Sequence, residues 1–223
     1  MNSRWTMKSI AKAVASTALL AGAGLTLAAN VPAGVQLHAS QEMVRNNGSE
    51  PDTLDPALAE GVPANNVIRD LFEGLTATDA NGKVVPGVAE SWKQVDPKTW
   101  VFKLRNNAKW SNGEGISAAD FIYSLRRFVD PKTASEYAST FGIFILNGKE
   151  ITAGKMPVTE LGVKALDPYT LEIKTPFPVG FMPDLVSNLQ LGPVHKATIE
   201  KFGKEWTKRS EEHTSELQSR YVI

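Results

Sequence analysis

Residues 87–113 read GVAESWKQVDPKTWVFKLRNNAKWSNG and contain three of the chain's five tryptophans, Trp92, Trp100 and Trp110. Within this segment, residues 100–105 alternate large apolar side chains with smaller or charged ones, which is the period of a strand with one buried face. Turn-forming residues stand on both sides, Asp-Pro-Lys at 96–98 and Ser-Asn-Gly at 111–113. The segment therefore predicts a strand bounded by two turns, with the tryptophans in the core of a small β-rich lobe.

Short motifs in and after this segment resemble those of one protein family in both order and spacing. The motifs are GVAESW at 87–92, WVFKLR at 100–105, AKWSNG at 108–113 and SAADFIYS at 117–124. They are similar to the extracytoplasmic solute-binding proteins of peptide ABC transporters (solute-binding protein family 5), above all to members that bind oligopeptides or murein peptides. The resemblance extends over about residues 31–208.

This resemblance implies an α+β fold that is part of a two-lobed periplasmic binding protein (type II, cluster C like), with mixed sheets, flanking helices and a truncated end. The irregular order of predicted strands and helices independently favours α+β over a doubly wound sheet. The expected organisation is a signal peptide at 1–28, a first segment of ligand lobe I at 29–72, the small lobe II at 73–195, a truncated return into lobe I at 196–208 and a non-native tail at 209–223.

The start of the chain has the composition of a cleaved secretory signal peptide. Arg4, Lys8 and Lys12 form a basic start without acidic residues, residues 13–27 are apolar, and residues 26–28 (Thr-Leu-Ala) form a small-x-small cleavage site. A membrane anchor is the alternative, but the apolar run is short for a bilayer span. The chain has no cysteine, so no lipoprotein anchor, disulfide or thiolate site is expected. We therefore expect a soluble protein exported to the periplasm.

The end of the chain departs abruptly from the family. Residues 209–219 read RSEEHTSELQS, which resembles the conceptual translation of a DNA-sequencing adapter. A genuine polar tail is the alternative, because such low hydrophobicity is also typical of disordered segments. We expect the adapter, and with it a truncated gene product.

Local patterns predict further helices and hairpins along the chain. A capping box at Ser117 and Asp120 is expected to open a helix that buries one apolar face and ends at Asp130-Pro131. The other predicted elements are a strand at 42–46, helices at 64–74, 180–189 and 196–202, a hairpin turn at 79–83, and a hairpin formed by 161–166 and 170–174.

Composition and motifs give no sign of catalysis or of nucleic-acid binding. Basic and acidic residues balance at 24 each, and no basic stripe is present. No catalytic or phosphate-binding signature occurs, and the three histidines, His38, His195 and His213, are scattered. The pair Asp52 and Asp55 is interpreted as turn and capping residues. We therefore expect no enzyme, no cofactor, no metal and no nucleic acid.

The candidate ligand residues come from the resemblance. It implies that Glu60, Gly61 and Val62 lie at the mouth between the lobes, where an extended peptide pairs with their backbone, and that the Glu60 side chain contacts a polar or basic ligand group. Gly61 would permit close approach of another backbone. Tyr137 is implied to line the cleft from the second lobe. An ordinary loop before a helix is the alternative for residues 60–62.

The resemblance implies a monomer that binds oligopeptides and delivers them to an inner-membrane ABC permease. Family members are much longer, and the groups implied to hold the peptide termini fall beyond this chain, so we expect weak or no binding by the chain alone. A murein peptide, a dipeptide, a nickel chelate or haem remain open as ligands. A secreted hydrolase is the alternative of another class. His195 departs from the family, which tends to have proline there.

Overall fold

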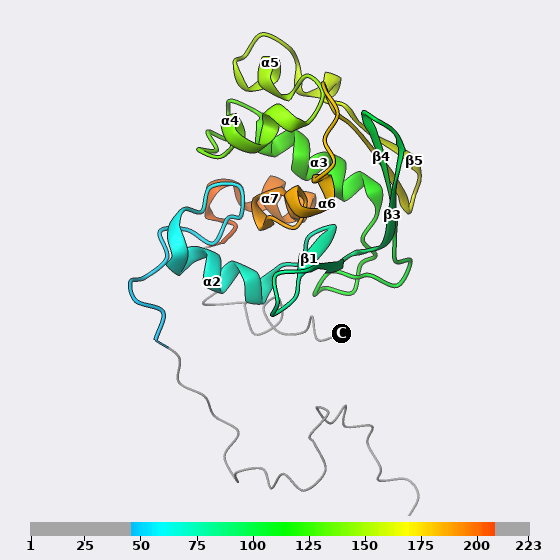
Figure 1. Cartoon of the computed structure of the whole chain (residues 1–223). Helices are drawn as coiled ribbons and strands as arrows, with labels where there is room; N and C mark the ends of the chain where they lie inside the picture. Colours follow the sequence, from blue (N-terminus) through cyan, green and yellow to red (C-terminus); the bar gives the residue numbers. More distant parts are fainter. Residues whose placement is uncertain (1–45, 208–223) are drawn as a thin grey trace, which may run out of the picture. The chain divides into compact units, whose positions relative to one another are not determined.

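The computed structural model describes residues 46–207, and its elements follow one another as labelled in Figure 1. The helices are α2 (Gly61–Leu71), α3 (Ala118–Val129), α4 (Ala138–Phe141), α5 (Gly148–Thr152), α6 (Met182–Leu185) and α7 (Lys196–Phe202). The strands are β1 (Thr76–Thr78), β2 (Val84–Pro86), β3 (Ala89–Asp96), β4 (Thr99–Leu104), β5 (Val163–Asp167) and β6 (Thr170–Lys174). Single 3-10 turns are η1 (Gly142–Phe144), η2 (Val158–Glu160), η3 (Leu189–Leu191) and η4 (Gly203–Glu205). The predicted signal peptide, the tail at 209–223 and all but the last residue of the strand at 42–46 lie outside the described residues.

The main sheet has four antiparallel strands in the order β3-β4-β6-β5. The predicted strand after residue 99 is β4, and it lies in the interior of the sheet, with Phe102 paired to Trp92 on one side and to Leu171 on the other. A separate hairpin, β1 with β2, contains the predicted turn at 79–83. Helices and antiparallel strands without regular alternation confirm the α+β class.

Two Asp-Pro turns connect the strands of this sheet, one between β3 and β4 and the other between β5 and β6. In each turn the aspartate side chain accepts a hydrogen bond from a backbone N–H two residues later, Lys98 N to Asp96 at 2.8 Å and Tyr169 N to Asp167 at 2.8 Å. The pKa of Asp96 is lowered mainly by its bond from Lys98, and that of Asp167 mainly by a bond from Thr170. The aspartates therefore stabilise the turns in their charged form.

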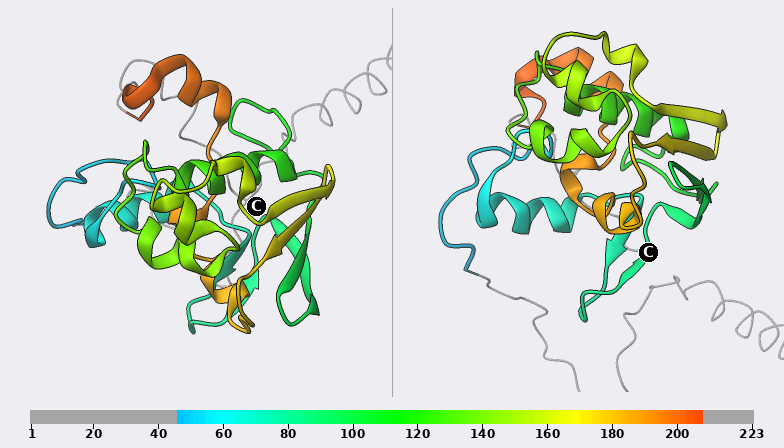
Figure 2. Two further views of the ribbon diagram at one scale, coloured as in Figure 1. Left: turned by 90° about the horizontal axis from the view of Figure 1, so that it is seen from above. Right: turned by 45° about the horizontal axis from the view of Figure 1, so that its top comes forward.

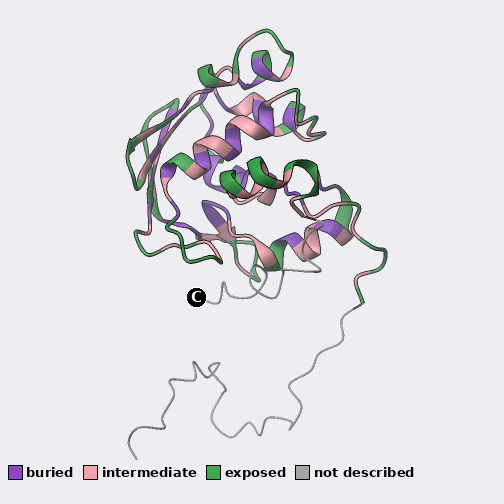
Figure 3. Ribbon diagram, turned by 180° about the vertical axis from the view of Figure 1, so that it is seen from behind, coloured by how far each residue is buried: buried purple, intermediate pink, exposed green. Residues whose placement is uncertain are grey.

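Helix α3 covers the apolar face of the sheet (Figures 1 and 2). The residues of its apolar face, Phe121, Leu125 and Phe128, are fully buried in one cluster with Phe102 and Leu171. Figure 3 shows this burial as buried stretches that alternate with partly buried ones along the helix. A second, smaller cluster joins Ala59, Ala64 and Ile68 under α2.

The three tryptophans of the first segment differ in burial. Trp100 is 7% exposed, and its indole N–H donates a 2.9 Å hydrogen bond to the carbonyl of Val179. Trp92 and Trp110 are only partly buried and pack against the margin of the core. Trp92 is on an edge strand and Trp110 follows the sheet in a loop, so neither is covered on all sides. The prediction of a core position is confirmed for Trp100, but it overstates the burial of Trp92 and Trp110.

Helix boundaries show where the sequence patterns were imprecise. Helix α2 begins at Gly61, not at residue 64, and ends at Leu71 because Phe72 turns to extended backbone (φ −126°, ψ 151°). A proline in the first helical turn needs no N–H partner, so Pro63 does not block this earlier start. The helix predicted at 180–189 shrinks to the single turn Met182–Leu185, whereas α7 has the predicted bounds.

The capping box of α3 should contribute measurably to stability. The Asp120 carboxylate accepts hydrogen bonds from the backbone N–H and the hydroxyl of Ser117, both at 2.8 Å. We expect Ser117→Ala to lower the free energy of unfolding by about 1 kcal/mol, as for other lost helix caps. Urea denaturation followed by circular dichroism measures this loss. Ser139→Ala, at an exposed serine, is the matched control, and equal effects of the two changes would contradict the role of the box.

Candidate functional site

Asp55 builds the turn that precedes the predicted ligand segment. Its carbonyl accepts hydrogen bonds from the N–H groups of Leu58 at 2.9 Å and Ala59 at 2.8 Å, and its carboxylate accepts one from Ala57 N at 3.1 Å. Ala57 and Ala59 are buried, while Glu60 directly after them is exposed. The turn therefore holds Ala57 and Ala59 in the core and leaves Glu60 at the surface.

Residues 60–62 stand at the start of α2, and all three are exposed. Glu60 has extended backbone (φ −122°, ψ 155°), and Val62 is 70% exposed. The first N–H groups of a helix have no partner within the helix, so this end can pair with another chain. Gly61 has φ +71°, a conformation that favours glycine, and a Cβ there would approach only Pro63, at 3.7 Å. The positive φ, more than a lack of space for a side chain, explains why residue 61 is a glycine.

Polar side chains hold this first helical turn in place. The Asn65 amide donates a 2.8 Å hydrogen bond to the carbonyl of Gly61, and Asn47 donates one of 3.0 Å to the carbonyl of Pro63. Asn65 itself accepts a 2.9 Å hydrogen bond from Gln190, which is only 8% exposed. The segment is thus tied to two other parts of the chain while its outer face stays open.

Tyr137, the fourth predicted ligand residue, lies on a different element. It is half-buried directly before α4, and its ring stacks on Phe141 with the ring centroids 5.6 Å apart. In Figure 1, α4 lies above α7 and α2 lies below it. Among the contacts that the structure gives for residues 46–207, none joins Tyr137 to residues 60–62. The structure thus keeps Glu60, Gly61 and Val62 together and places Tyr137 separately.

Sequence reasoning missed an ion pair at the base of this segment. The buried carboxylate of Asp55 receives two hydrogen bonds from the guanidinium of Arg127 on α3, at 2.9 and 2.5 Å. A third comes from the indole N–H of Trp206 at 2.9 Å. The interpretation of Asp55 as a turn residue is confirmed, but the distant partners left no signal in the sequence pattern.

His195 also has partners that the sequence did not reveal. Its Nε2 lies 2.8 Å from the carboxylate of Glu114, and its Nδ1 lies 2.7 Å from the hydroxyl of Thr198. The hydrogen bond from His195 is the largest cause of a lowered pKa for Glu114, with Asn112 second. Thr198 is in the first turn of α7 and His195 directly precedes that helix, so the contact joins two side chains at the start of α7.

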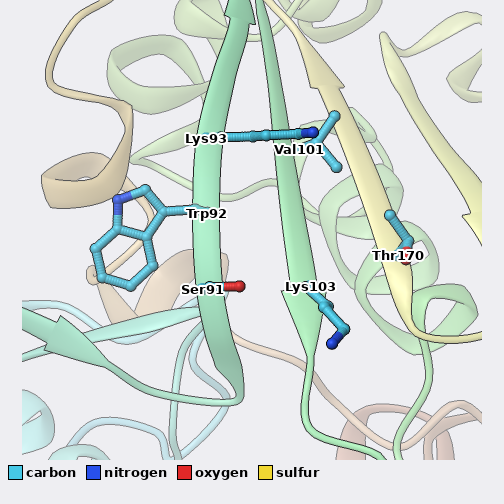
Figure 4. A pocket seen from close by; sticks show the side chains of 6 residues that line it. All are labelled: Ser91, Trp92, Lys93, Val101, Lys103 and Thr170. Carbon is cyan, nitrogen blue, oxygen red and sulfur yellow. The ribbon is translucent and has the colours of Figure 1, made fainter.

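Two surface depressions in the described part of the chain contain none of the predicted ligand residues. One, of about 300 Å³, lies on the outer face of the sheet (Figure 4). Its lining residues are Ser91, Trp92, Lys93, Val101, Lys103 and Thr170. The other, of about 280 Å³, lies beside η1 and α5.

Residues 46–207 lack two further features. They contain no helix that combines the length and the apolar character needed to cross a bilayer. They also contain no group of three or more histidine and acidic side chains placed to hold a metal ion.

Comparison with known proteins identifies the family. Residues 83–215 match the model of the bacterial extracellular solute-binding proteins, family 5 Middle. The chain belongs to this family. Two curated relatives come from Escherichia coli (strain K12): the periplasmic oligopeptide-binding protein OppA is 51% identical over 91% of this chain, and the periplasmic murein peptide-binding protein MppA is 46% identical over 85%. The chain spans only 37% and 35% of their respective lengths.

A solved structure extends the likeness to three dimensions. Haemophilus influenzae OppA in complex with RPPGFSPFR matches with a TM-score of 0.75 and 44% identity, over 79% of this chain and 35% of that one. The expected relationship and the expected fold are therefore confirmed. The family and these relatives are named as binding proteins, which supports the expectation that the chain is not an enzyme.

Proposed function

We propose that this chain belongs to the periplasmic substrate-binding component of a peptide ABC transporter, which binds extended oligopeptides and passes them to an inner-membrane permease. The observation that carries the proposal is the 51% identity to a periplasmic oligopeptide-binding protein over nearly the whole chain. The peptide complex of the Haemophilus influenzae relative supports the ligand class. The residues at 1–28 would direct export to the periplasm, and the protein would act as a monomer.

Main-chain pairing is the proposed mode of binding. The extended backbone of Glu60 and the unpaired start of α2 suit the addition of a peptide strand, a mode that accepts many sequences because it uses groups common to all peptides. The exposed carboxylate of Glu60 adds attraction for basic or polar ligand groups. Tyr137 would contribute a ring from the small lobe, on the other side of the cleft.

The proposed division into lobes has some support from packing. The large apolar cluster is built mainly by the sheet and α3, within the proposed small lobe at 73–195, while the small cluster under α2 belongs to the proposed lobe I segment. The segment from 196 onward, with α7, would return to lobe I. The tail at 209–223 stays a separate, sequence-based prediction.

A murein peptide is the second candidate ligand. The observation that favours it is the 46% identity to a periplasmic murein peptide-binding protein. Both candidates require main-chain recognition of a short peptide. They would differ in the groups that hold the peptide ends, which we expect outside this chain.

The proposal predicts weak and localised peptide binding by this chain. We expect a titration with trilysine to shift the NMR signals of Glu60, Gly61 and Val62 with a dissociation constant of about 1 mM, because a partial cleft provides only part of the contacts. Glu60→Gln should remove the preference for trilysine over trialanine. Glu50→Gln, at another exposed glutamate before the helix, is the matched control.

The position of the shifted signals and the peptide affinity test the proposed site. Shifts confined to residues 60–62 and Tyr137 support the site. No shift at saturating peptide concentration, or shifts elsewhere only, would reject these residues as the site. Binding at low micromolar concentration would contradict the expectation that this chain forms only part of the cleft.

A further inference from the structure

The carboxylate of Asp55 has no free acceptor site. Its side chain is 4% exposed. One oxygen accepts from Ala57 N at 3.1 Å and from Arg127 Nη1 at 2.9 Å, and the other accepts from Arg127 Nη2 at 2.5 Å and from Trp206 Nε1 at 2.9 Å. A carboxylate offers about four lone-pair positions, and all of them are filled. Asp55 therefore has one permitted orientation.

The main chain of Asp55 connects this fixed side chain to the predicted ligand residues 60–62. Its carbonyl holds the N–H groups of Leu58 and Ala59, the last residue before Glu60. Ala59 is fully buried and packs with Ala64 and Ile68 of α2. A displacement of Asp55 would therefore move the turn and the start of α2 together.

Arg127 connects this turn to a well-packed helix of the proposed small lobe. It lies in the last turn of α3, a helix held on the sheet by the fully buried Phe121, Leu125 and Phe128. Its own side chain is 15% exposed. Two parallel bonds from a guanidinium to a carboxylate fix direction as well as distance. The pair therefore joins the turn at 55–59 to the layer that α3 forms on the main sheet.

Trp206 extends the same connection to the far end of α2. Its indole N–H binds Asp55, and its ring packs edge-on against Phe72, with the centroids 6.4 Å apart and the planes at 83°. Phe72 directly follows the last residue of α2. The helix that carries the ligand segment is thus held before its first residue and after its last by groups that meet at one carboxylate.

We propose that Arg127 and Asp55 are positioning residues for peptide binding: without touching the ligand, they set where Glu60, Gly61 and Val62 stand relative to the small lobe. The inference rests on the proposed function for the role of residues 60–62. The positional claim itself depends only on the contacts of Asp55, so the two can fail separately.

Residue-resolved amide exchange on the full chain tests the positional claim. We expect Arg127→Gln to accelerate exchange at Leu58 and Ala59 by about tenfold or more, and to move the Trp206 indole signal, while the amides that pair β4 with β6 keep their protection. Arg127→Lys, which keeps the charge but loses the two-bond geometry, should restore part of that protection. Arg126→Gln is the matched control, because this neighbouring arginine of α3 binds the carbonyl of Thr159 (2.9 Å) and not Asp55, so its loss should leave Leu58, Ala59 and Trp206 unchanged.

Two results would overturn the positional claim. One is unchanged exchange at Leu58 and Ala59 in Arg127→Gln. The other is an equal rise throughout the sheet, which would show that the pair supports only global stability. If Arg127→Gln fails to fold, Arg127→Lys is measured by the same criteria and decides the question.

Trilysine titration separates this inference from the proposed function. A positioning role predicts that Arg127→Gln lowers the affinity for trilysine, measured from the shifts at residues 60–62, by about tenfold, whereas Arg126→Gln does not. Absence of peptide shifts in the unmodified chain would reject the proposed function while the exchange result still stands. Normal peptide affinity in a variant with rapid exchange at Leu58 would show that the pair orders the turn without positioning the ligand site, which rejects the inference.

Discussion

Phe102→Ala should lower the free energy of unfolding by about 3–5 kcal/mol, the range found for large buried aromatic side chains truncated to alanine. Phe102 is fully buried on the interior strand β4, lies between paired residues of β3 and β6, and stacks on Trp100 with the ring centroids 6.4 Å apart. The change removes contacts on all of these sides and leaves a cavity beneath α3. Urea denaturation followed by far-ultraviolet circular dichroism measures the loss.

Phe177→Ala is the matched control for this change. It removes the same atoms from a side chain that is 46% exposed, so we expect a loss of about 1 kcal/mol or less. A domain of ordinary stability has about 5–15 kcal/mol in total, so the change at Phe102 should shift the midpoint visibly. Similar losses at the two positions would contradict the assignment of Phe102 to the centre of the core.

The predictions that succeeded are those with a local physical cause. Strand β4 was predictable because Phe102 and Leu104 alternate with more exposed neighbours, and its turn because Asp96 caps a backbone N–H two residues later. Helix α3 was predictable from its capping box and its apolar face. In contrast, the start of α2 depends on the positive φ of Gly61, and the apolar pattern from residue 64 onward does not show that conformation.

The candidate site was much harder to predict from short sequence patterns. Glu60, Gly61 and Val62 have no chemical signature and became candidates only through the family resemblance. The ion pair of Asp55 with Arg127 joins residues 72 positions apart, and the contact of His195 with Glu114 spans 81 positions. Such pairs depend on how the helices pack on the sheet, which a pattern of short period does not encode.

Gly87→Ala is the second change for which we expect a large effect, a loss of about 3 kcal/mol in the free energy of unfolding. An added Cβ would lie 2.6 Å from the carbonyl oxygen of Gly74 and 3.0 Å from that of Leu75. Both obstacles are backbone atoms, so no rotamer change relieves them. The chain would have to separate where Val88 N binds Gly74 O and Ala89 N binds Leu75 O, each at 2.9 Å.

The position of this clash makes it a test of how the proposed small lobe begins. Residues 74–76 lie at the start of the proposed small lobe and residues 87–89 lead into β3, so the two bonds between them join the start of the lobe to an edge strand of the main sheet. Gly115→Ala is the matched control: a Cβ there meets nothing within 4 Å, and we expect a change within about 0.5 kcal/mol. Denaturation in urea compares the two variants. If Gly87→Ala were as stable as Gly115→Ala, the two segments would have to lie farther apart than the structure places them.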